Sequence, residues 1–368
     1  MQFARRTVTK VAASAFAALI AFAPAAQACT GITLTAKDGT VVRARTMEFN
    51  VNLQSEVILV PRGYERTGET PDGKPGLKWK VKYANVGTNP EGLPYVVDGL
   101  NEKGLSMGLF YFDQSAKYQP YKPEDASKTM ASWQLGSYIL DNFATVEEVK
   151  AALSDVVVAP VVFKAFNIVL PVHFVVTDPT GASIVIEYVD GKLNIHDDQI
   201  GIITNNPPFD WHMTNLQNYV NLSVTNSAPQ KLGDVTIEGL GQGTGLLGMP
   251  GDFTSPSRFV RAAIFAHGIG PVANSDHAVF QAFHILNNFD IPKGVARADE
   301  ASSDGKISAD YTQWTSANDL ANKRFYFRTY DNSDIRFVDL TKQKLDGDDI
   351  QTWSMDGYEV AHELGQPE

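Results

Sequence analysis

The chain has 368 residues, with 31 Lys or Arg against 42 Asp or Glu, which gives a formal net charge of −11 at neutral pH. This acidic balance argues against nucleic acid or an anionic membrane surface as a partner. A hydrophobic content of 43% with 20% charged residues is typical of a globular protein and excludes a disordered one. A single cysteine allows no internal disulfide, so stability must come from a large core.

Residues 1–28 have the features of a secretory signal peptide. Three basic residues precede an apolar run over residues 11–22, and Ala26 and Ala28 occupy the small-residue positions of a cleavage site. Cleavage there leaves 28 Lys or Arg against 42 Asp or Glu, a formal charge of −14. We therefore expect a periplasmic or secreted protein with one folded domain over residues 29–368. The arginine pair near the start only weakly resembles a twin-arginine signal, and the export route stays open.

Cleavage makes Cys29, the only cysteine, the first residue, with a thiol and a free α-amine on one residue. A thiol with a pKa of about 8.5 needs a base to become a nucleophile at neutral pH, and an α-amine with a pKa of about 7.7 to 8.0 can serve as that base. Three alternatives remain: a small buried hydrophobe, a lipid-modified cysteine, or chance placement at the cleavage point. Lipidation usually requires Leu three residues before the cysteine, where this chain has Ala26.

The segment from Cys29 to Arg45 predicts a β-hairpin around Asp38-Gly39. With a two-residue loop, Cys29 faces Glu48 on the second strand. With a three-residue loop, Gly31 faces Arg45, and Cys29 and Arg45 share one face of the sheet. Both registers bring a charged residue to the thiol, although Arg45 and Glu48 are equally compatible with solvated strand charges.

The remaining elements alternate in blocks of strands and helices, without a dividing linker. Strands are predicted over residues 56–61, 79–86, 95–112 (two strands around a turn at 101–104), 172–177, 183–189, 192–196, 200–203, 311–316, 324–330 and 335–341. Helices are predicted over residues 127–142, 145–153, 210–222, 257–267 and 276–288. No apolar run after Cys29 is long enough to span a bilayer, so we expect no stable membrane anchor.

Two polar residues are site candidates because of their positions next to predicted elements. Asn205 follows the short run at 200–203, and the prolines after it block both a helix and a ladder, so its side chain is placed at a strand exit where it can face a site. The alternative is a turn asparagine that bonds its own backbone. Arg258 lies in the first turn of a helix, where a cation opposes the helix dipole, and this makes it a site candidate.

Several other kinds of site are excluded by their missing signatures. The glycine-rich segment 239–251 lacks the preceding strand and the Lys-Ser/Thr pair of a phosphate loop, so we predict a flexible loop there. The seven histidines show no metal-ligand spacing, and no G-x-S-x-G elbow is present. We expect no metal and no cofactor.

Four motifs follow one another along the chain: Cys29-Thr-Gly with Arg45-Thr-Met-Glu48, Asp98-Gly-Leu-Asn-Glu-Lys-Gly-Leu105, Thr204-Asn-Asn-Pro207, and Pro250-Gly-Asp with Ser257-Arg-Phe-Val-Arg261. In this order they resemble the choloylglycine hydrolase family of bile salt hydrolases and penicillin V acylases, within the N-terminal nucleophile hydrolases. The resemblance implies an α+β fold, an αββα four-layer sandwich of two antiparallel sheets between helix layers. It also implies a homotetramer.

The resemblance assigns roles to the polar residues. Cys29 is implied as the nucleophile and its α-amine as the base, with Arg45 beside the thiol favouring the thiolate. Glu48 stands where the family usually has Asp and is implied to orient the α-amine. Asn205 is implied to donate its amide to the oxyanion, a contact worth roughly 3 to 4 kcal/mol in comparable enzymes. Arg258 is implied to anchor the site through its hydrogen bonds.

The aromatic residues near these motifs bear on the substrate. Phe110 takes the place of the family's Asn or Tyr, and its backbone N–H is implied to complete the oxyanion hole. An apolar acyl pocket is predicted from Phe49, Phe110, Tyr111, Phe112 and Trp211, with ordinary core packing as the alternative for each.

Such a pocket suits a small-molecule amide with an aromatic or fatty acyl group. The export signal and Glu48 favour the penicillin V acylase branch of Gram-negative bacteria, with N-acyl homoserine lactones as further candidate substrates. Bile salt hydrolysis is the alternative reaction. An exported or lipid-anchored binding protein for apolar ligands is the non-enzyme alternative.

Overall fold

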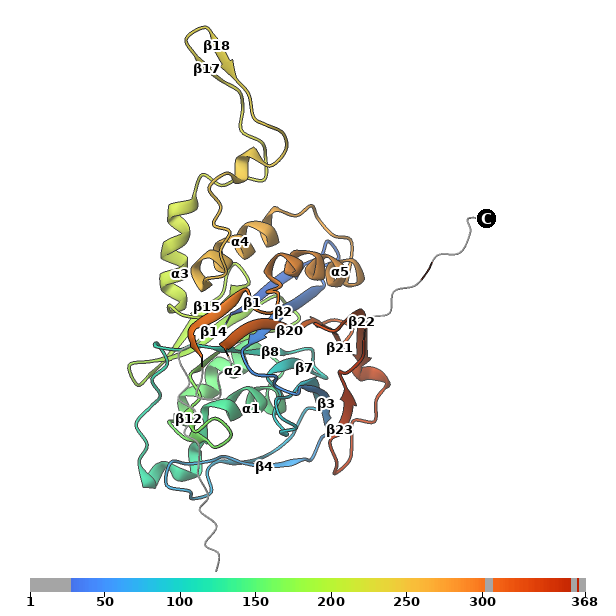
Figure 1. Ribbon diagram of the computed structural model, residues 1–368. Helices are drawn as coiled ribbons and strands as arrows, with labels where there is room; N and C mark the ends of the chain where they lie inside the picture. The colour runs from blue at the N-terminus through green and yellow to red at the C-terminus, as the bar shows by residue number, and fades with distance from the viewer. Residues whose placement is uncertain (1–27, 302–306, 359–362, 364–368) are drawn as a thin grey trace, which may run out of the picture.

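The computed structural model describes residues 28–301, 307–358 and 363, so all but the last residue of the predicted signal peptide lies outside the described residues. In the described part of the chain the fold has four layers, with α4 (Ser255–Gly268) and α5 (Ser275–Leu286) over one sheet and a second sheet beneath it (Figure 1). The helices α1 (Leu135–Asn142) and α2 (Val146–Ala152) cover the far side of the second sheet. This arrangement confirms the αββα sandwich.

The first sheet carries the N-terminal strand near one edge, and all its strand pairs are antiparallel. Its strands in spatial order are β16 (Ile202–Ile203), β1 (Cys29–Thr35), β2 (Val41–Phe49), β20 (Ile307–Asp319), β21 (Arg324–Thr329) and β22 (Asn332–Asp339), with β19 (Ala296–Ala301) also paired to β20. Strands β20, β21 and β22 thus continue the sheet that the first hairpin begins.

The second sheet is also antiparallel throughout. Its strands in spatial order are β15 (Lys192–Asp197), β14 (Ser183–Val189), β13 (Val172–Thr177), β8 (Ser106–Tyr111), β7 (Asp98–Asn101), β6 (Asn85–Thr88), β3 (Glu56–Val60) and β23 (Gln351–Ser354). In the described part of the chain, four short ladders lie outside both sheets: β4 (Glu65–Thr67) with β5 (Lys78–Lys80), β9 (Thr129–Ala131) with β10 (Val157–Ala159), β11 (Val162–Phe163) with β12 (Ile168–Val169), and β17 (Gln230–Leu232) with β18 (Val235–Ile237).

The β1–β2 hairpin closes with a three-residue loop. Gly31 pairs with Arg45 and Cys29 with Met47, and the Ala36 N–H donates to Thr40 O at 2.9 Å. Gly39 adopts a φ of 84°, the left-handed conformation that such a loop requires. The three-residue alternative is therefore confirmed, and the register that set Cys29 opposite Glu48 is wrong.

Gly31 allows the two sheets to approach each other beside the reactive residue. A Cβ at this position would lie 2.8 Å from Phe110 Cζ and 2.9 Å from Ile203 Cγ2, closer than real Cβ atoms come. It would come closer still to Arg43 Nη2, so any larger side chain would have to displace Arg43 and Ile203 as well as the Phe110 ring. Gly31 thus leaves room for Phe110 to pack against β1 next to Cys29.

The predicted helix over residues 127–142 is wrong in its first half. Residues Pro123–Lys128 form a 3₁₀ turn, Thr129–Ala131 pair in parallel with β10, and α1 begins only at Leu135. Strand pairing in the buried structure outweighs the helical spacing of the apolar residues there. The predicted start of α2 is confirmed, since the Glu148 N–H donates to Thr145 Oγ1 at 3.2 Å.

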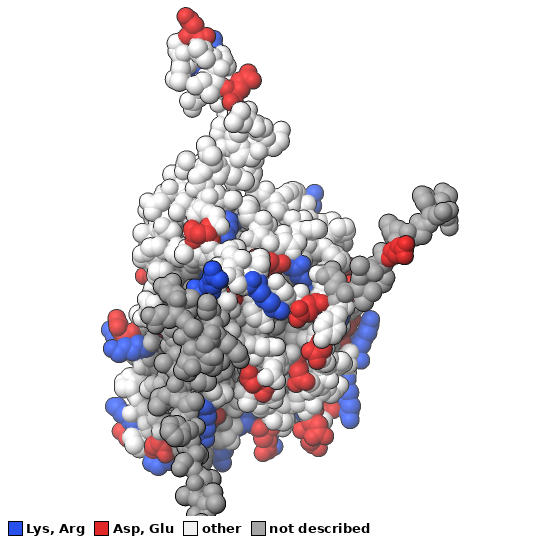
Figure 2. Space-filling view, viewed as in Figure 1, with Lys and Arg blue, Asp and Glu red and all other residues white. Residues whose placement is uncertain are grey.

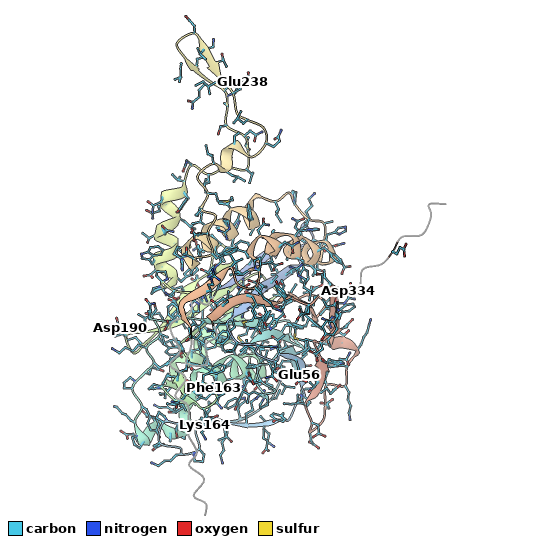
Figure 3. All side chains as sticks on the ribbon, in the orientation of Figure 1. Glu56, Phe163, Lys164, Asp190, Glu238 and Asp334 are labelled. Carbon is cyan, nitrogen blue, oxygen red and sulfur yellow. The ribbon has the colours of Figure 1, made fainter. Side chains whose placement is uncertain are left out.

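A long arm, residues 220–249, extends from the body and ends in the small hairpin of β17 (Gln230–Leu232) and β18 (Val235–Ile237) (Figure 1). Glu238 marks its outer half in Figure 3. The arm follows α3 (Phe209–Asn215) and a 3₁₀ turn, so the predicted helix over residues 210–222 ends early. Sequence analysis placed a loop in this region and missed the hairpin.

Among the described helices, none is long and apolar enough to cross a membrane.

Candidate active site

Cys29 begins β1 and is only 2% exposed, but it lines an apolar cavity. Its Sγ lies 4.0 Å from Met47 Sδ and 3.9 Å from the Glu48 carbonyl oxygen. Burial raises the pKa of the thiol, and the nearby positive charge of Arg45 is the largest effect opposing that rise. The thiol therefore needs a base to ionise at neutral pH.

The backbone of Cys29 is held by two residues from distant parts of the chain. Its nitrogen donates to Asn205 Oδ1 at 2.8 Å. Arg258 Nη2 donates to the same oxygen at 2.7 Å, while Arg258 Nη1 donates to the Cys29 carbonyl and, at 3.0 Å, to Thr30 Oγ1. Asn205 and Arg258, both site candidates in the sequence, therefore meet at Cys29.

Arg258 points its guanidinium away from its own helix and into the first sheet. It is buried, and its Nε donates to Phe253 O at 2.8 Å. Burial lowers the pKa of Arg258 to about 10, and the negative charge of Glu48 is the largest effect opposing this. The guanidinium is thus held by hydrogen bonds to Phe253, Cys29, Thr30 and Asn205, and not by the helix dipole.

Glu48 lies among hydroxyl groups. Its Oε1 accepts from Thr312 Oγ1 at 2.7 Å and its Oε2 from Thr46 Oγ1 at 3.0 Å, because a β-bulge between Met47 and Glu48 sets Glu48 opposite Thr312. Burial raises the pKa of Glu48 to about 8, although Arg258 opposes this. The resemblance gave Glu48 the contact with the Cys29 nitrogen; in the structure Asn205 makes that contact.

Arg45 is packed between the two sheets. Its guanidinium carbon lies 4.0 Å from the Phe110 ring centroid and 5.4 Å from that of Trp314. Its Nε donates to Thr46 O at 3.1 Å, and its Nη1 donates to Leu109 O. Both Arg45 and Glu48 are fully buried. The alternative of solvated strand charges is therefore wrong for both residues.

The predicted role of the Phe110 N–H in an oxyanion hole is also wrong. The Phe112 N–H donates to Pro171 O at 2.7 Å, on the side of β8 where β13 lies. The Leu109 N–H donates to Val97 O at 2.7 Å, on the opposite side, where β7 lies. Alternation in an antiparallel ladder therefore directs the Phe110 N–H toward its partner on β13, His173. Tyr111, one residue on, lies closer to the site, and its carbonyl accepts from Asn205 Nδ2 at 2.8 Å.

The cavity at Cys29 has a volume of about 80 Å³, and aromatic and aliphatic side chains form most of its wall. Two of the five predicted pocket residues, Phe49 and Tyr111, line it. Phe110 and Phe112 point to the opposite side of β8, where Phe112 stacks on His173 with the centroids 4.3 Å apart. Trp211 lies on α3, is 44% exposed and does not line the cavity.

Sequence analysis missed most of the cavity wall. The further lining residues are Met47, Leu53, Pro90, Glu91, Leu93, Tyr95, Val97, Leu109, Trp133, Phe163, Phe166, Leu170 and Val172. Phe166 stacks against Phe49 with their centroids 5.9 Å apart. A usable signal was the largely apolar segment 161–170, which Pro160 and Pro171 bound on either side. Within the described ranges, no three His, Cys, Asp or Glu side chains are grouped to hold a metal ion.

The family model of linear amide C–N hydrolases, choloylglycine hydrolase family, matches residues 29–353. The chain belongs to the choloylglycine hydrolase family. It is therefore an enzyme that hydrolyses linear carbon–nitrogen amide bonds. A bile salt hydrolase/transferase of Clostridium perfringens is 36% identical over 329 residues, which cover 88% of this chain and 96% of that protein. A penicillin V acylase of Pectobacterium atrosepticum is 26% identical over 322 residues, covering 82% and 77%.

Solved structures of family members show the same fold. The crystal structure of a variant of the conjugated bile acid hydrolase from Clostridium perfringens matches with a TM-score of 0.80 at 33% identity, covering 92% of this chain and 100% of that one. The penicillin V acylase from Agrobacterium tumefaciens matches with a TM-score of 0.70 at 25% identity, covering 90% and 93%. The N-terminal nucleophile hydrolase fold inferred from the four motifs is confirmed.

Proposed function

We propose that the mature protein begins at Cys29 and uses this thiol, with its own α-amine as the base, to hydrolyse amides of apolar acyl groups. The position of Cys29 carries this proposal. Its sulfur faces an apolar cavity, and its nitrogen lies 2.8 Å from Asn205 Oδ1. The contact with Asn205 fixes the nitrogen of Cys29 while its thiol faces the cavity, so both groups of the residue are positioned for the reaction.

In the proposed reaction the α-amine takes the thiol proton, and the thiolate attacks the amide carbon. Asn205 Nδ2 carries two hydrogens; one bonds to Tyr111 O, and the second is assigned to the oxyanion. The carbon–nitrogen bond then breaks, and the leaving amine receives the proton from the α-ammonium. Water, deprotonated by the α-amine, hydrolyses the thioester and regenerates the thiol.

The walls of the cavity favour a flat aromatic or a linear aliphatic acyl group. At about 80 Å³ the cavity is smaller than the ~150 Å³ space that admits benzene, so side chains such as Phe166 must shift to admit an acyl group. A phenoxyacetyl or fatty acyl chain requires less movement than a rigid steroid. This supports penicillin V acylase-like activity, with N-acyl homoserine lactones as further substrates.

Hydrolysis of bile salts is the second candidate, because the bile salt hydrolase/transferase of Clostridium perfringens is more similar to this chain than the Pectobacterium penicillin V acylase is. A substrate panel separates the two. We expect the processed enzyme to give higher kcat/KM for penicillin V and long-chain N-acyl homoserine lactones than for taurocholate. A clear preference for taurocholate would establish the second candidate instead.

We further propose an exported, periplasmic or secreted, homotetramer. The sequence Ala26-Gln27-Ala28 supports export. For assembly, the arm exposes Leu240, Leu247 and Val235 and carries few charges, as Figure 2 shows. Light scattering on the full mature chain and on a variant shortened by residues 229–239 tests this. We expect a tetramer for the first and smaller species for the second; a monomeric mature chain contradicts the proposal.

A further inference from the structure

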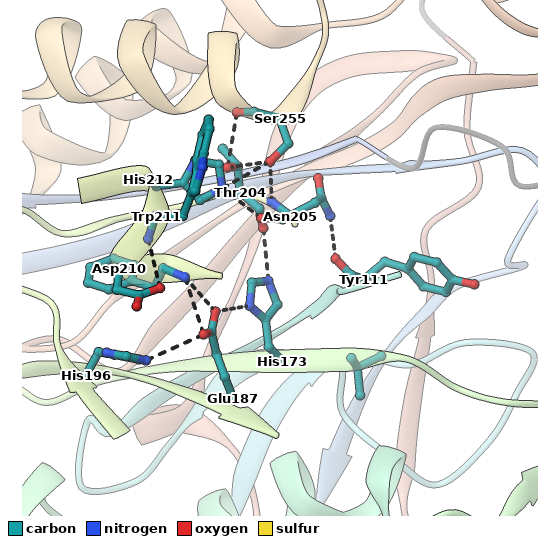
Figure 4. A network of polar contacts seen from close by, with 12 residues as sticks. Tyr111, His173, Glu187, His196, Thr204, Asn205, Asp210, Trp211, His212 and Ser255 are labelled. Atoms are coloured by element: carbon teal, nitrogen blue, oxygen red, sulfur yellow. Dashed lines mark hydrogen bonds and ion pairs between the residues drawn. The ribbon is translucent and has the colours of Figure 1, made fainter. Parts of the chain in front are cut away.

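A buried carboxylate on the second sheet holds both ends of the loop that carries Asn205. Glu187 on β14 is fully buried, and its Oε1 lies 3.1 Å from His173 Nδ1. The other ring nitrogen of His173 lies 3.2 Å from Thr204 O, just before Asn205 (Figure 4). After the loop, the Phe209 N–H donates to the two Glu187 carboxylate oxygens at 3.1 and 3.3 Å.

The atoms around His173 define its hydrogen bonds. A carboxylate oxygen and a carbonyl oxygen can only accept, so both ring nitrogens must donate if both contacts are hydrogen bonds. The Glu187 carboxylate accepts one of these hydrogen bonds and Thr204 O the other. Burial opposes ionisation of Glu187, but hydrogen bonds from His173 and His196 hold its pKa down at about 2. Stacking on Phe112 fixes the plane of the His173 ring.

The backbone of Asn205 itself is held from two further sides. Its N–H donates to Ser255 Oγ of α4 at 3.0 Å, and its carbonyl lies 2.9 Å from His212 Nε2 on α3 (Figure 4). Since α3 begins at Phe209, the position of His212 also depends on the contact between Phe209 and Glu187.

We propose that Glu187, acting through His173 and through the start of α3, is a positioning residue for the Asn205 side chain. This rests on the proposed role of Asn205 at the oxyanion. Neither Glu187 nor His173 lines the cavity, so their effect reaches the substrate only through the loop. A displacement of about 1 Å at Asn205 is sufficient to slow the reaction by about 100-fold.

The test is the variant Glu187→Gln, which keeps the shape of the side chain but removes its charge. We expect kcat to fall about 10- to 100-fold with KM within about threefold, because the loop supports the transition state more than substrate binding. His173→Phe provides a second variant that keeps the stacking on Phe112 and removes both hydrogen bonds. It should show the same separation of kcat from KM.

Asp141→Asn is the matched control. Asp141 is also a fully buried carboxylate, with Arg66 Nε and Trp79 Nε1 each 2.7 Å away, but it lies on α1 and away from the Asn205 loop. This variant should lower the melting temperature and leave kcat unchanged. If Asp141→Asn lowers kcat as much as Glu187→Gln does, the effect is general destabilisation and the inference is wrong.

Asn205→Ala, measured in parallel, separates this inference from the proposed function. If Asn205→Ala is inactive while folded Glu187→Gln and His173→Phe keep kcat within twofold of the wild type, only the role of Glu187 is rejected. If Asn205→Ala keeps wild-type activity, the proposed oxyanion contact fails, and this inference fails with it.

Discussion

Arg258 and Asn205 are joined by a hydrogen bond of 2.7 Å from Nη2 to Oδ1, and the nitrogen of Cys29 donates to the same oxygen. The site is therefore assembled from the first strand, the exit of β16 and the first turn of α4. Arg258 also donates to the Cys29 carbonyl, so both ends of the Cys29 backbone are fixed by residues more than 170 positions away.

Arg258→Met is expected to lower kcat/KM by about 100-fold and stability by about 3 kcal/mol. The substitution removes the cation whose charge most opposes the raised pKa of Glu48, takes away the Arg258 donor of the Cys29 carbonyl, and leaves Asn205 Oδ1 with the Cys29 nitrogen as its donor. Arg261→Met is the control, because Arg261 is buried on the same helix but bonds only to the carbonyls of Pro250 and Asp252. Equal losses of activity in the two variants would show that Arg258 has no special role.

The pH dependence of stability is expected to change in Glu48→Gln. A carboxyl whose folded pKa is about 8, against 4.5 when unfolded, keeps its proton in the folded state after the unfolded chain has lost it. Its contribution to stability therefore decreases as the pH rises from 4.5 to about 8. Thermal melting at about pH 5 and about pH 8 should show Glu48→Gln gaining stability relative to the wild type at the higher pH. Parallel melting profiles would show that Glu48 does not titrate in this window.

Phe166→Ala is expected to broaden the acyl preference. Phe166 stacks on Phe49 in the cavity wall, and removing it makes room for longer or bulkier acyl groups. We expect kcat/KM for long acyl chains to rise about 10-fold relative to that for penicillin V, because accommodating even one more methylene group in an apolar pocket is worth about 10-fold or more. Trp211→Ala is the control and should leave the ratio unchanged, because Trp211 lies outside the cavity. A change in the ratio for Trp211→Ala and none for Phe166→Ala would mean that the acyl group binds elsewhere.

Most strands and helices were predictable from the sequence because they follow local rules, whereas the arrangement in two sheets and the roles of the polar residues came from the family resemblance. Strand alternation and turn residues predict the strands, and one of the two registers allowed by the turn at Asp38-Gly39 brings Arg45 to the face of Cys29. Arg258 stood out because a cation at a helix start needs a partner elsewhere. Its partners, Asn205 and Cys29, confirm that reasoning.

The cavity wall and the hydrogen bonds that link Glu187 to the Asn205 loop were not predictable, since they depend on contacts between distant segments. Phe110 and Tyr111 are neighbours in sequence, yet only the pleat of β8 decides that Tyr111 lines the cavity and Phe110 packs under Arg45. Similarly, no spacing rule links Glu187 to Asn205. Their connection exists only because His173 on β13 contacts both Glu187 on β14 and the Thr204 carbonyl after β16.

Cys29→Ser is expected to fold normally and to lose activity by about 10³-fold or more. The thiol makes only long contacts to Met47 and Glu48, so its replacement by a hydroxyl should cost little stability. A hydroxyl is far less acidic than a thiol, and an amine with a pKa near 8 is a weak base for it. The comparison is made with equal amounts of folded protein, checked by circular dichroism. Turnover close to that of the wild type would exclude Cys29 as the nucleophile.

Processing before Cys29 gives the last prediction, because the proposed base exists only after cleavage. In the uncut chain the Cys29 nitrogen is an amide that donates to Asn205, and Ala28 beside it is only 3% exposed. A protein that retains Gln27-Ala28 should fold, but its activity should fall about 10²- to 10⁴-fold, because it lacks the contribution of general base catalysis. Obstruction of the thiol by Ala28 should lower the activity further.

The matched control is a chain that starts Met-Cys29, from which methionine aminopeptidase removes Met before a small residue, so that it should be fully active. Mass spectrometry confirms the first residue of each protein before assay. In the trimmed enzyme, the acidic limb of kcat/KM should follow a group of the free N-terminus, whose pKa is about 7.7 to 8.0 when unperturbed. Activity of the folded Gln27-Ala28 protein within a few-fold of the trimmed enzyme would mean that another residue is the base, and the role of the α-amine would have to be abandoned.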